Sequence, residues 1–300
     1  MAWRPLRDGM RHKQQQNGMN NNYTYRALWQ RLQPVYDERE AKAVVGMVLE
    51  ERFGLTLTDI VCGGVEALGS EQCEELEQMM RRLETGEPVQ YVLGSARFCG
   101  RSFRVEPATL IPRPETEQLV GMVSDFARRM ARPAILDVGT GTGCVATSVA
   151  LECPAARVTA WDISEEALRV AHGNALRLGA EVDFCRQDAL CPPALDENKW
   201  DAIVSNPPYV MEKERAAMAV NVLRYEPSLA LFVPDDDPLC FYRALAVYGR
   251  KALKDGGGLF FEINPLQAAP LASLLEEEGY REVAILADAF GKQRFAQAIK

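Results

Sequence analysis

Three stretches of apolar residues at helical spacing occupy the first third of the chain. They lie within residues 25–32, 41–49 and 76–83, where apolar side chains recur every three or four positions. Asp37 precedes the second stretch, as a residue that caps a helix N-terminus does. We interpret residues 23–86 as a small helical domain, with these faces forming its packed core.

A different pattern follows the helical region. Apolar and polar residues alternate over 89–93 and again over 103–105, around the turn-forming Gly94 and Gly100. This alternation predicts a β-hairpin, which we place in a linker spanning residues 87–113.

From residue 114 to 300 the pattern repeats as strand, turn and helix. Such alternation predicts an α/β fold with a mostly parallel, doubly wound sheet that helices cover on both faces. A turn is expected over 253–258, and the last two strands are expected to form an antiparallel closing pair. The predicted strands span residues 134–138, 157–161, 182–185, 200–204, 259–263, 283–286 and 294–299.

Composition and charge narrow the choice of function. The 300 residues are 47% hydrophobic, and no stretch approaches the roughly 20 apolar residues of a membrane-spanning helix. The formal net charge of −8 gives no general attraction to nucleic acid phosphates. The eight cysteines form no Cys-x-x-Cys pair and there are only two histidines, so we expect no metal site. We expect the cysteines to be reduced thiols in a cytoplasmic protein. The basic, polar residues 1–22 are expected to be a disordered tail.

A glycine-rich turn follows the first strand of the predicted sheet. In the run Gly139-Thr-Gly141-Thr-Gly143, glycines let the backbone turn sharply and approach a ligand closely. A dinucleotide fingerprint would need glycine in place of Cys144, and the Lys-Ser/Thr of a P-loop is missing. The turn alone is weak evidence for a site, because a tight connection between strand and helix also explains it.

Two acidic residues lie at the ends of the next two strands. Asp162 is placed to accept hydrogen bonds from both hydroxyls of a ribose, although it also suits the N-terminus of the following helix. Asp188 is placed to accept from the exocyclic amine of an adenine, although alone it is only a loop acid. Together with the glycine turn they favour binding of an adenosine-containing cofactor.

The motif Asn206-Pro-Pro-Tyr209 follows the fourth strand directly. The two prolines fix the backbone and carry no amide donors. The Asn206 side-chain oxygen and the Pro207 carbonyl oxygen can therefore both accept hydrogen bonds from one planar NH₂ group, which Tyr209 would stack against or hold. We predict modification of a planar nitrogen here.

In combination these features resemble a class I methyltransferase that uses S-adenosylmethionine. More narrowly, the chain from about residue 23 to 300 resembles the release factor glutamine N5-methyltransferases, through its Ile111-Pro-Arg-Pro-Glu-Thr-Glu117 segment coupled to Asn206-Pro-Pro-Tyr209. Four places depart from that family's pattern, and they include residues 233–239 and Ala287. Asn264 stands where glycine is common, and Ala189 where an aromatic residue sometimes follows the adenine-contacting acid.

The resemblance implies a reaction and a set of residues. The expected reaction transfers methyl to the side-chain amide nitrogen of the glutamine in the Gly-Gly-Gln motif of class 1 peptide chain release factors, and leaves S-adenosylhomocysteine. Residues 23–86 would help to bind the release factor, and a monomer is expected. Expected cofactor-binding residues are Gly139, Thr140, Gly141, Thr142, Gly143, Asp162, Asp188 and Asn206. Expected catalytic residues are Asn206, Pro207 and Tyr209, and expected substrate-binding residues are these three with Pro208, Arg113 and Glu115.

Three other functions compete with this interpretation. A nucleic-acid amino-methyltransferase would use the same Asn-Pro-Pro-Tyr motif on a nucleobase amine, but the chain is acidic and has no basic, aromatic-rich segment. A binding module with a decayed methyltransferase fold is disfavoured by the intact Asp162 and Asn206. A nicotinamide dehydrogenase is excluded at Cys144.

Overall fold

The computed structural model describes residues 23–300, so the tail predicted for residues 1–22 lies outside the described residues. The chain forms two compact units that divide between Leu93 and Gly94, whereas the predicted boundaries followed residues 86 and 113. Within the described residues no helix is both long and apolar enough to cross a bilayer.

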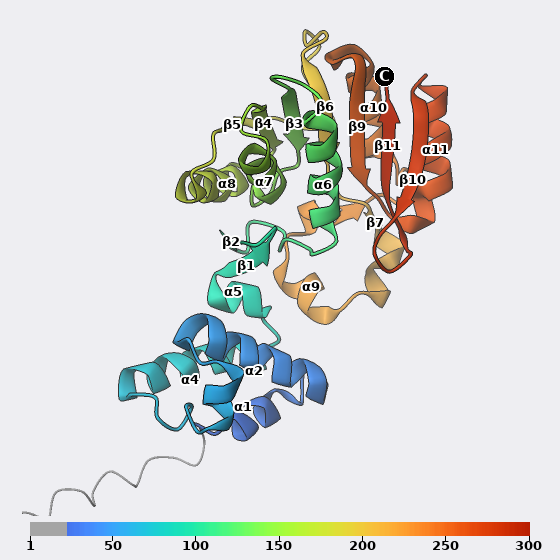
Figure 1. Ribbon diagram of the computed structural model, residues 1–300. Coiled ribbons are helices and arrows are strands. Elements are labelled where there is room, and N and C mark those ends of the chain that lie inside the picture. The colour runs from blue at the N-terminus through green and yellow to red at the C-terminus, as the bar shows by residue number, and fades with distance from the viewer. Residues whose placement is uncertain (1–22) are drawn as a thin grey trace, which may run out of the picture. The chain divides into compact units, whose positions relative to one another are not determined.

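The first unit is built of helices (Figure 1). The second of them begins at Asp37, whose side chain accepts from the Glu40 amide, and ends at Gly54, which has a left-handed φ of 67°. Between the helices lies a single apolar core that includes Leu28, Leu49 and Leu76, all fully buried. The helices are α1 (Tyr25–Leu32), α2 (Glu38–Phe53), α3 (Leu57–Val61), α4 (Ser70–Glu84) and α5 (Val89–Leu93).

The predicted strand at 89–93 is wrong, because this segment is helix α5. Val89 and Tyr91 are buried, but so is Val92, and the Pro88 carbonyl begins the helix by accepting hydrogen bonds from the Tyr91 and Val92 amides. A five-residue apolar run does not by itself distinguish a helix from a strand. The hairpin lies just beyond, where β1 (Ser95–Phe98) pairs antiparallel with β2 (Arg101–Arg104) around Cys99 and Gly100.

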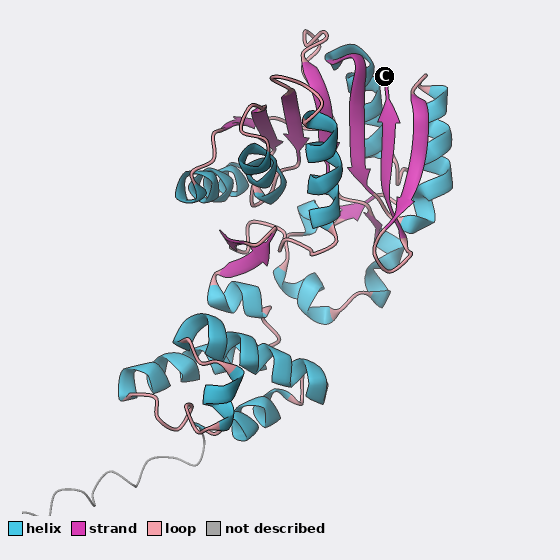
Figure 2. Ribbon diagram, in the orientation of Figure 1, coloured by secondary structure: helices cyan, strands magenta, loops and turns pink. Residues whose placement is uncertain are grey.

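The second unit contains a seven-stranded sheet in the order β10-β11-β9-β6-β3-β4-β5 (Figure 2). All neighbouring pairs are parallel except those of β11, which is antiparallel to both β9 and β10. The predicted sheet and its closing antiparallel pair are therefore confirmed. The strands are β3 (Ala134–Val138), β4 (Arg157–Asp162), β5 (Val182–Arg186), β6 (Trp200–Ser205), β9 (Leu253–Glu262), β10 (Arg281–Ala287) and β11 (Gln293–Ile299).

Strand β9 is longer than expected. The turn predicted at 253–258 belongs to the strand, because Leu253 already pairs with Trp200 and the register shifts before Gly258 pairs with Ala202. Three glycines in a row at 256–258 made the segment look like a turn, and in the structure they lie at this irregularity.

Helices cover both faces of the sheet, and the alternation along each strand decides which core a side chain enters. Ile135 packs on the face of α6 (Thr116–Ala127) and α7 (Cys144–Glu152), whereas Leu136 packs on the opposite face. The opposite face is covered by α10 (Cys240–Ala252) and α11 (Ala268–Glu277). Helix α8 (Glu165–Leu178) packs against β4 and β5. The unit also contains helix α9 (Val220–Tyr225) and a short parallel pair of strands, β7 (Val210–Met211) and β8 (Phe232–Val233).

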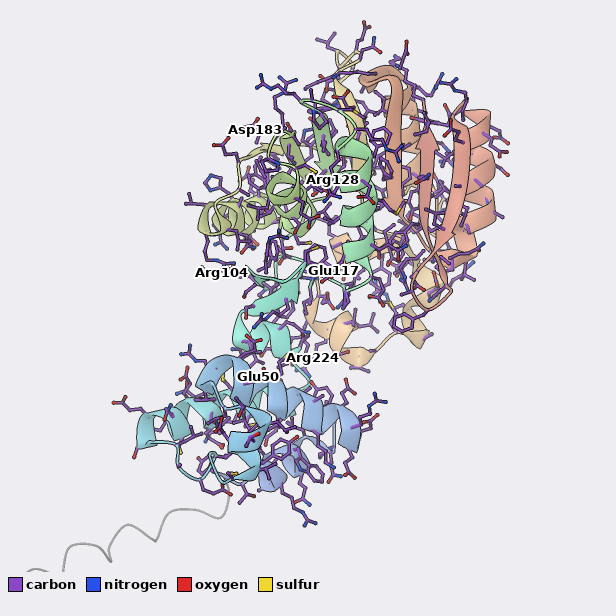
Figure 3. The ribbon with its side chains drawn as sticks, viewed as in Figure 1. Glu50, Arg104, Glu117, Arg128, Asp183 and Arg224 are labelled. Atoms are coloured by element: carbon purple, nitrogen blue, oxygen red, sulfur yellow. The ribbon has the colours of Figure 1, made fainter. Side chains whose placement is uncertain are left out.

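The hairpin is joined to the sheet domain through α6. The Glu117 side chain, labelled in Figure 3, accepts a hydrogen bond from the Cys99 amide at 2.8 Å. Asn174 of α8 holds the other strand, since its side chain exchanges hydrogen bonds with both backbone polar groups of Arg104. The hairpin therefore belongs to the sheet domain, and the segment that follows it leads into the site.

Candidate active site

The glycine-rich turn lies where β3 ends. The amides of Gly139 and Thr140 both donate to the Trp161 carbonyl oxygen at 2.9 Å, which holds the turn against β4. Gly139, Gly141 and Gly143 all have positive φ, at 73°, 55° and 75°. These conformations explain why glycine occupies each of the three positions.

The residues of this turn face different surroundings. A Cβ at Gly141 would meet no atom within 4 Å, whereas a Cβ at Gly143 would lie 2.9 Å from Cβ of Ala171 in α8. Thr140 is buried and donates to the Asp137 carboxylate at 2.6 Å, and burial raises the pKa of Asp137 to about 7. Gly141 therefore faces open space, while Gly143 and Thr140 support the turn from within.

Asp162 organises the end of β4. Its two carboxylate oxygens accept from the Gly141 amide and from the Ser164 amide, each at 2.9 Å. Burial raises the pKa of Asp162, and these amide donors act in the opposite direction. Each oxygen retains acceptor capacity for a further donor, so the carboxylate can hold the turn and bind hydroxyls at once.

Asp188 lies in the loop after β5. Its side chain accepts from the Leu190 amide at 2.8 Å and its carbonyl accepts from the Cys191 amide. These bonds fix the carboxylate at the end of its strand.

One cavity of about 430 Å³ joins most of these elements, a size suited to a small-molecule ligand. It brings together the following predicted residues: Gly139, Gly141, Asp162, Asp188, Asn206, Pro207 and Pro208. It is also lined by residues that sequence reasoning did not select: Pro107, Ala108, Thr109, Leu110, Ile163, Leu190, Pro227, Leu229, Ala230 and Phe241. Most of these are apolar residues in loops, which carry no periodic pattern that would have identified them.

Thr140, Thr142, Gly143, Tyr209, Arg113 and Glu115 are not among the residues that line this cavity. Thr142 is buried, with its carbonyl oxygen accepting from the Asn174 side chain at 3.0 Å. Arg113 instead pairs with the buried carboxylate of Glu226 at 2.5 Å, and the second Glu226 oxygen accepts from the Ile111 amide. This pair ties the proline-rich segment to the end of α9.

The Asn206–Tyr209 motif begins where β6 ends. Asn206 and both prolines line the cavity, and Pro207 is buried. The Tyr209 ring packs against the apolar core beneath, with its hydroxyl donating to Glu262 at 3.0 Å. The motif thus presents Asn206 and the prolines to the cavity and anchors itself through Tyr209.

Glu262 is the functional candidate that sequence reasoning missed. It is 1% exposed at the end of β9, and it accepts from Thr116 at 2.6 Å as well as from Tyr209. Burial raises the pKa of Glu262, whereas the two hydroxyl donors and the nearby Arg294 lower it. A single acid within the apolar run 259–263 was the available signal.

Chemically, the cavity is lined by carboxylates and an open backbone turn and also by the amide and carbonyl acceptors of Asn206 and Pro207. Asp162 and Asp188 are suited to the hydroxyls and amine of an adenosine. Asn206 and Pro207 are suited to a planar amine. The arrangement fits a nucleoside cofactor and a nitrogen substrate bound side by side.

Comparison with known proteins agrees with this geometry. The family described as methyltransferase small domain matches residues 120–227, and the PrmC N-terminal domain matches residues 26–94. Among solved structures, the hMettl16 catalytic domain in complex with MAT2A 3'UTR hairpin 6 has a TM-score of 0.51 over 67% of this chain and 75% of that chain, at 17% identity. That likeness concerns the fold alone.

Relatives at higher identity share almost the whole chain. The release factor glutamine methyltransferase of Bacteroides thetaiotaomicron is 46% identical over 90% of this chain and 96% of its own. Those of Flavobacterium psychrophilum and Enterococcus faecalis are 37% and 40% identical, over 88% and 84% of this chain and 94% and 90% of their own. The chain belongs to the release factor glutamine methyltransferase family.

Proposed function

We propose that this protein transfers a methyl group from S-adenosylmethionine to the side-chain amide nitrogen of the glutamine in the Gly-Gly-Gln motif of class 1 peptide chain release factors. The observation that carries the proposal is that Asn206 and Pro207 line the same cavity as Gly141 and Asp162. Acceptors for a planar NH₂ group therefore share one space with a turn and a carboxylate suited to an adenosine. The relatives named for this reaction, over nearly the whole chain, support the choice of substrate.

The residues present fit S-adenosylmethionine. The open space at Gly141 admits close approach of a ligand to the backbone, which a side chain would block. Asp162 would accept from the ribose hydroxyls and Asp188 from the adenine amine. Ile163, Leu190 and the other apolar lining residues would enclose the adenine ring.

When bound, the cofactor supplies an electrophilic methyl group on a sulfonium. The difficulty is the nucleophile, because an amide nitrogen shares its lone pair with its carbonyl. Asn206 and the Pro207 carbonyl would accept the two amide N–H groups, which weakens that sharing and orients the lone pair toward the methyl. As positive charge builds on the nitrogen, both acceptors bind it more strongly, so they stabilise the transition state selectively.

Alignment supplies much of the remaining acceleration. Holding two reacting groups in line is worth roughly 7–11 kcal/mol in favourable intramolecular models. The methylated amide nitrogen first carries an extra proton, which is acidic and can leave to water. A dedicated general base is therefore not required.

Glu115 and Arg113 would contribute to release factor binding near the entrance, and the helical unit would bind the body of that protein. Because release factors act in translation, we expect the protein in the cytoplasm.

Peptide mass spectrometry of a class 1 release factor incubated with the protein and labelled cofactor tests the proposal. We expect one added methyl group, located on the Gly-Gly-Gln glutamine. Parallel incubations with DNA and RNA test the nucleic-acid alternative. Label in a nucleobase, with none in the release factor, would overturn the proposal.

A further inference from the structure

Two buried side chains lie behind Asn206 and outside the cavity. Thr116, the first residue of α6, is 2% exposed, and Glu262, at the end of β9, is 1% exposed. The Asn206 side-chain nitrogen lies 3.4 Å from Thr116 Oγ1, and Thr116 Oγ1 lies 2.6 Å from Glu262 Oε2. Thr116 therefore links Asn206, which lines the cavity, to the buried Glu262.

The directions of these hydrogen bonds follow from counting protons. A hydroxyl has one proton, and at 2.6 Å the Thr116 proton is donated to the carboxylate of Glu262. Only lone pairs of Thr116 Oγ1 then remain for Asn206, so the NH₂ group of Asn206 must face Thr116. The amide oxygen of Asn206 is therefore turned the other way.

Glu262 is well suited to keep this direction. An ionised carboxylate only accepts, and its other oxygen already accepts from the Tyr209 hydroxyl at 3.0 Å. Burial raises the pKa of Glu262, and the two hydroxyls and the Arg294 guanidinium act in the opposite direction. Both carboxylate oxygens lie within hydrogen-bond distance of a hydroxyl, at 2.6 and 3.0 Å, so each is placed to accept and the Thr116 proton is directed at Glu262.

We propose that Thr116 and Glu262 are positioning residues that hold the Asn206 amide in one of its two orientations, with its oxygen presented to the substrate NH₂ group. This inference rests on the proposed function, because it gives Asn206 the role of an acceptor. With the amide reversed, its NH₂ group would meet the substrate NH₂ group, and two donors repel. Neither Thr116 nor Glu262 lines the cavity, so neither is expected to contact the cofactor.

The test compares Thr116→Val, Thr116→Ser and Glu262→Ala. Valine has the shape of threonine without the hydroxyl, so we expect kcat to fall about 10- to 100-fold, as for other residues that orient a reactive side chain. The dissociation constant of S-adenosylmethionine, measured by calorimetry, should stay within about twofold. Thr116→Ser keeps the hydroxyl and should keep most of the wild-type kcat. Glu262→Ala removes the acceptor of the Thr116 proton, which can then be donated to the Asn206 amide oxygen, so kcat should fall with little change in cofactor affinity.

Thr147→Val is the matched control. Thr147 is also fully buried, in α7, and its hydroxyl has no hydrogen-bond partner among the described residues. The same substitution there should leave kcat unchanged. Wild-type kcat in a folded Thr116→Val, or a cofactor affinity that falls in proportion to kcat, would overturn the inference. The variants are compared on whichever substrate the wild type methylates. If the proposed function is wrong, the wild type does not methylate the release factor. If this inference is wrong, the wild type is active and the variants do not show the expected changes in kcat.

Discussion

The Asn264 side chain donates a hydrogen bond to the Tyr209 carbonyl oxygen at 3.1 Å and a second to the Glu214 carboxylate at 2.8 Å. Glu214 in turn accepts from the Met211 amide at 2.9 Å. Asn264 is 4% exposed and occupies a position where the family's pattern commonly has glycine. In this chain the side chain therefore ties the end of the Asn-Pro-Pro-Tyr motif to the segment after β9.

Asn264→Ala should loosen this motif. The substitution removes the side-chain donor to the Tyr209 carbonyl and one of the two donors to Glu214, and each such hydrogen bond contributes about 0.5–1.5 kcal/mol. We expect a lower midpoint in urea unfolding and a lower kcat, because Asn206 and Pro207 precede Tyr209 directly. Gln78→Ala, at an exposed position of α4, is the control and should change neither. An unchanged unfolding midpoint in Asn264→Ala would show that these hydrogen bonds contribute nothing.

Gly141 and Gly143 should respond differently to alanine, although the sequence presents them as one motif. At Gly143 the added methyl would meet Ala171 at 2.9 Å and the φ of 75° is strained for alanine, so we expect a stability loss of at least about 1–3 kcal/mol. At Gly141 only the conformational strain applies, about 1–2 kcal/mol, and the methyl projects into open space.

Cofactor titration distinguishes the two glycines further. Gly141→Ala should weaken S-adenosylmethionine binding by more than its stability loss accounts for, because Gly141 lines the cavity and Gly143 does not. Gly173→Ala, in an open helical position of α8, is the control and should stabilise by about 0.5–1 kcal/mol. Equal cofactor affinity in Gly141→Ala and the wild type would remove this turn from the binding site.

Asn206→Ala should lose turnover far more than cofactor affinity. The substitution removes one of two acceptors for the reacting NH₂ group, and loss of one such group typically costs about 10²- to 10³-fold in kcat. Single-turnover methylation of the release factor and calorimetry with S-adenosylmethionine measure the two effects separately. Cofactor affinity lost in proportion to rate would assign Asn206 to cofactor binding instead.

Local sequence features predicted most of the fold. The capping residue Asp37 marked the start of α2 correctly, and apolar runs located the seven strands of the main sheet. The failures are local ambiguities. Residues 89–93 are too short for the helical and strand periods to be distinguished, and the glycines at 256–258 are compatible with both a turn and an irregular strand.

The site was predictable only where it follows the order of the strands. Asp162 ends β4, while Asp188 and Asn206 lie just beyond the ends of β5 and β6, so the convergence of the three followed from the topology. Thr116 and Glu262 lie 146 residues apart and Arg113 and Glu226 lie 113 apart, and no periodicity connects either pair. Such contacts depend on how helices and loops pack on the sheet, which a single sequence does not specify.

Asp162→Asn should weaken S-adenosylmethionine binding. Asparagine keeps one acceptor but places an NH₂ group opposite a backbone amide of Gly141 or Ser164, and it removes the charge that would bind the ribose. A lost charge-assisted hydrogen bond is worth about 1.5–3 kcal/mol, or roughly 10- to 100-fold in the dissociation constant. Asp183→Asn, at the exposed acid of β5 labelled in Figure 3, is the control and should bind as the wild type does. Equal affinities in the two variants would contradict the ribose assignment.

Asp137 should make the stability of the protein fall as pH rises through neutrality. Burial raises its pKa from 3.8 to about 7, so between these values the folded state holds a proton that the unfolded state has released. Unfolding then releases this proton, and stability decreases with pH until the folded carboxyl also ionises. Asp137→Asn retains an oxygen to accept from Thr140 and Ala146 and does not titrate. The Tm of the wild type relative to Asp137→Asn should therefore fall between pH 5 and about pH 8 and level off above it. A Tm difference that is constant over this range would mean that Asp137 is already ionised in the folded protein at pH 5.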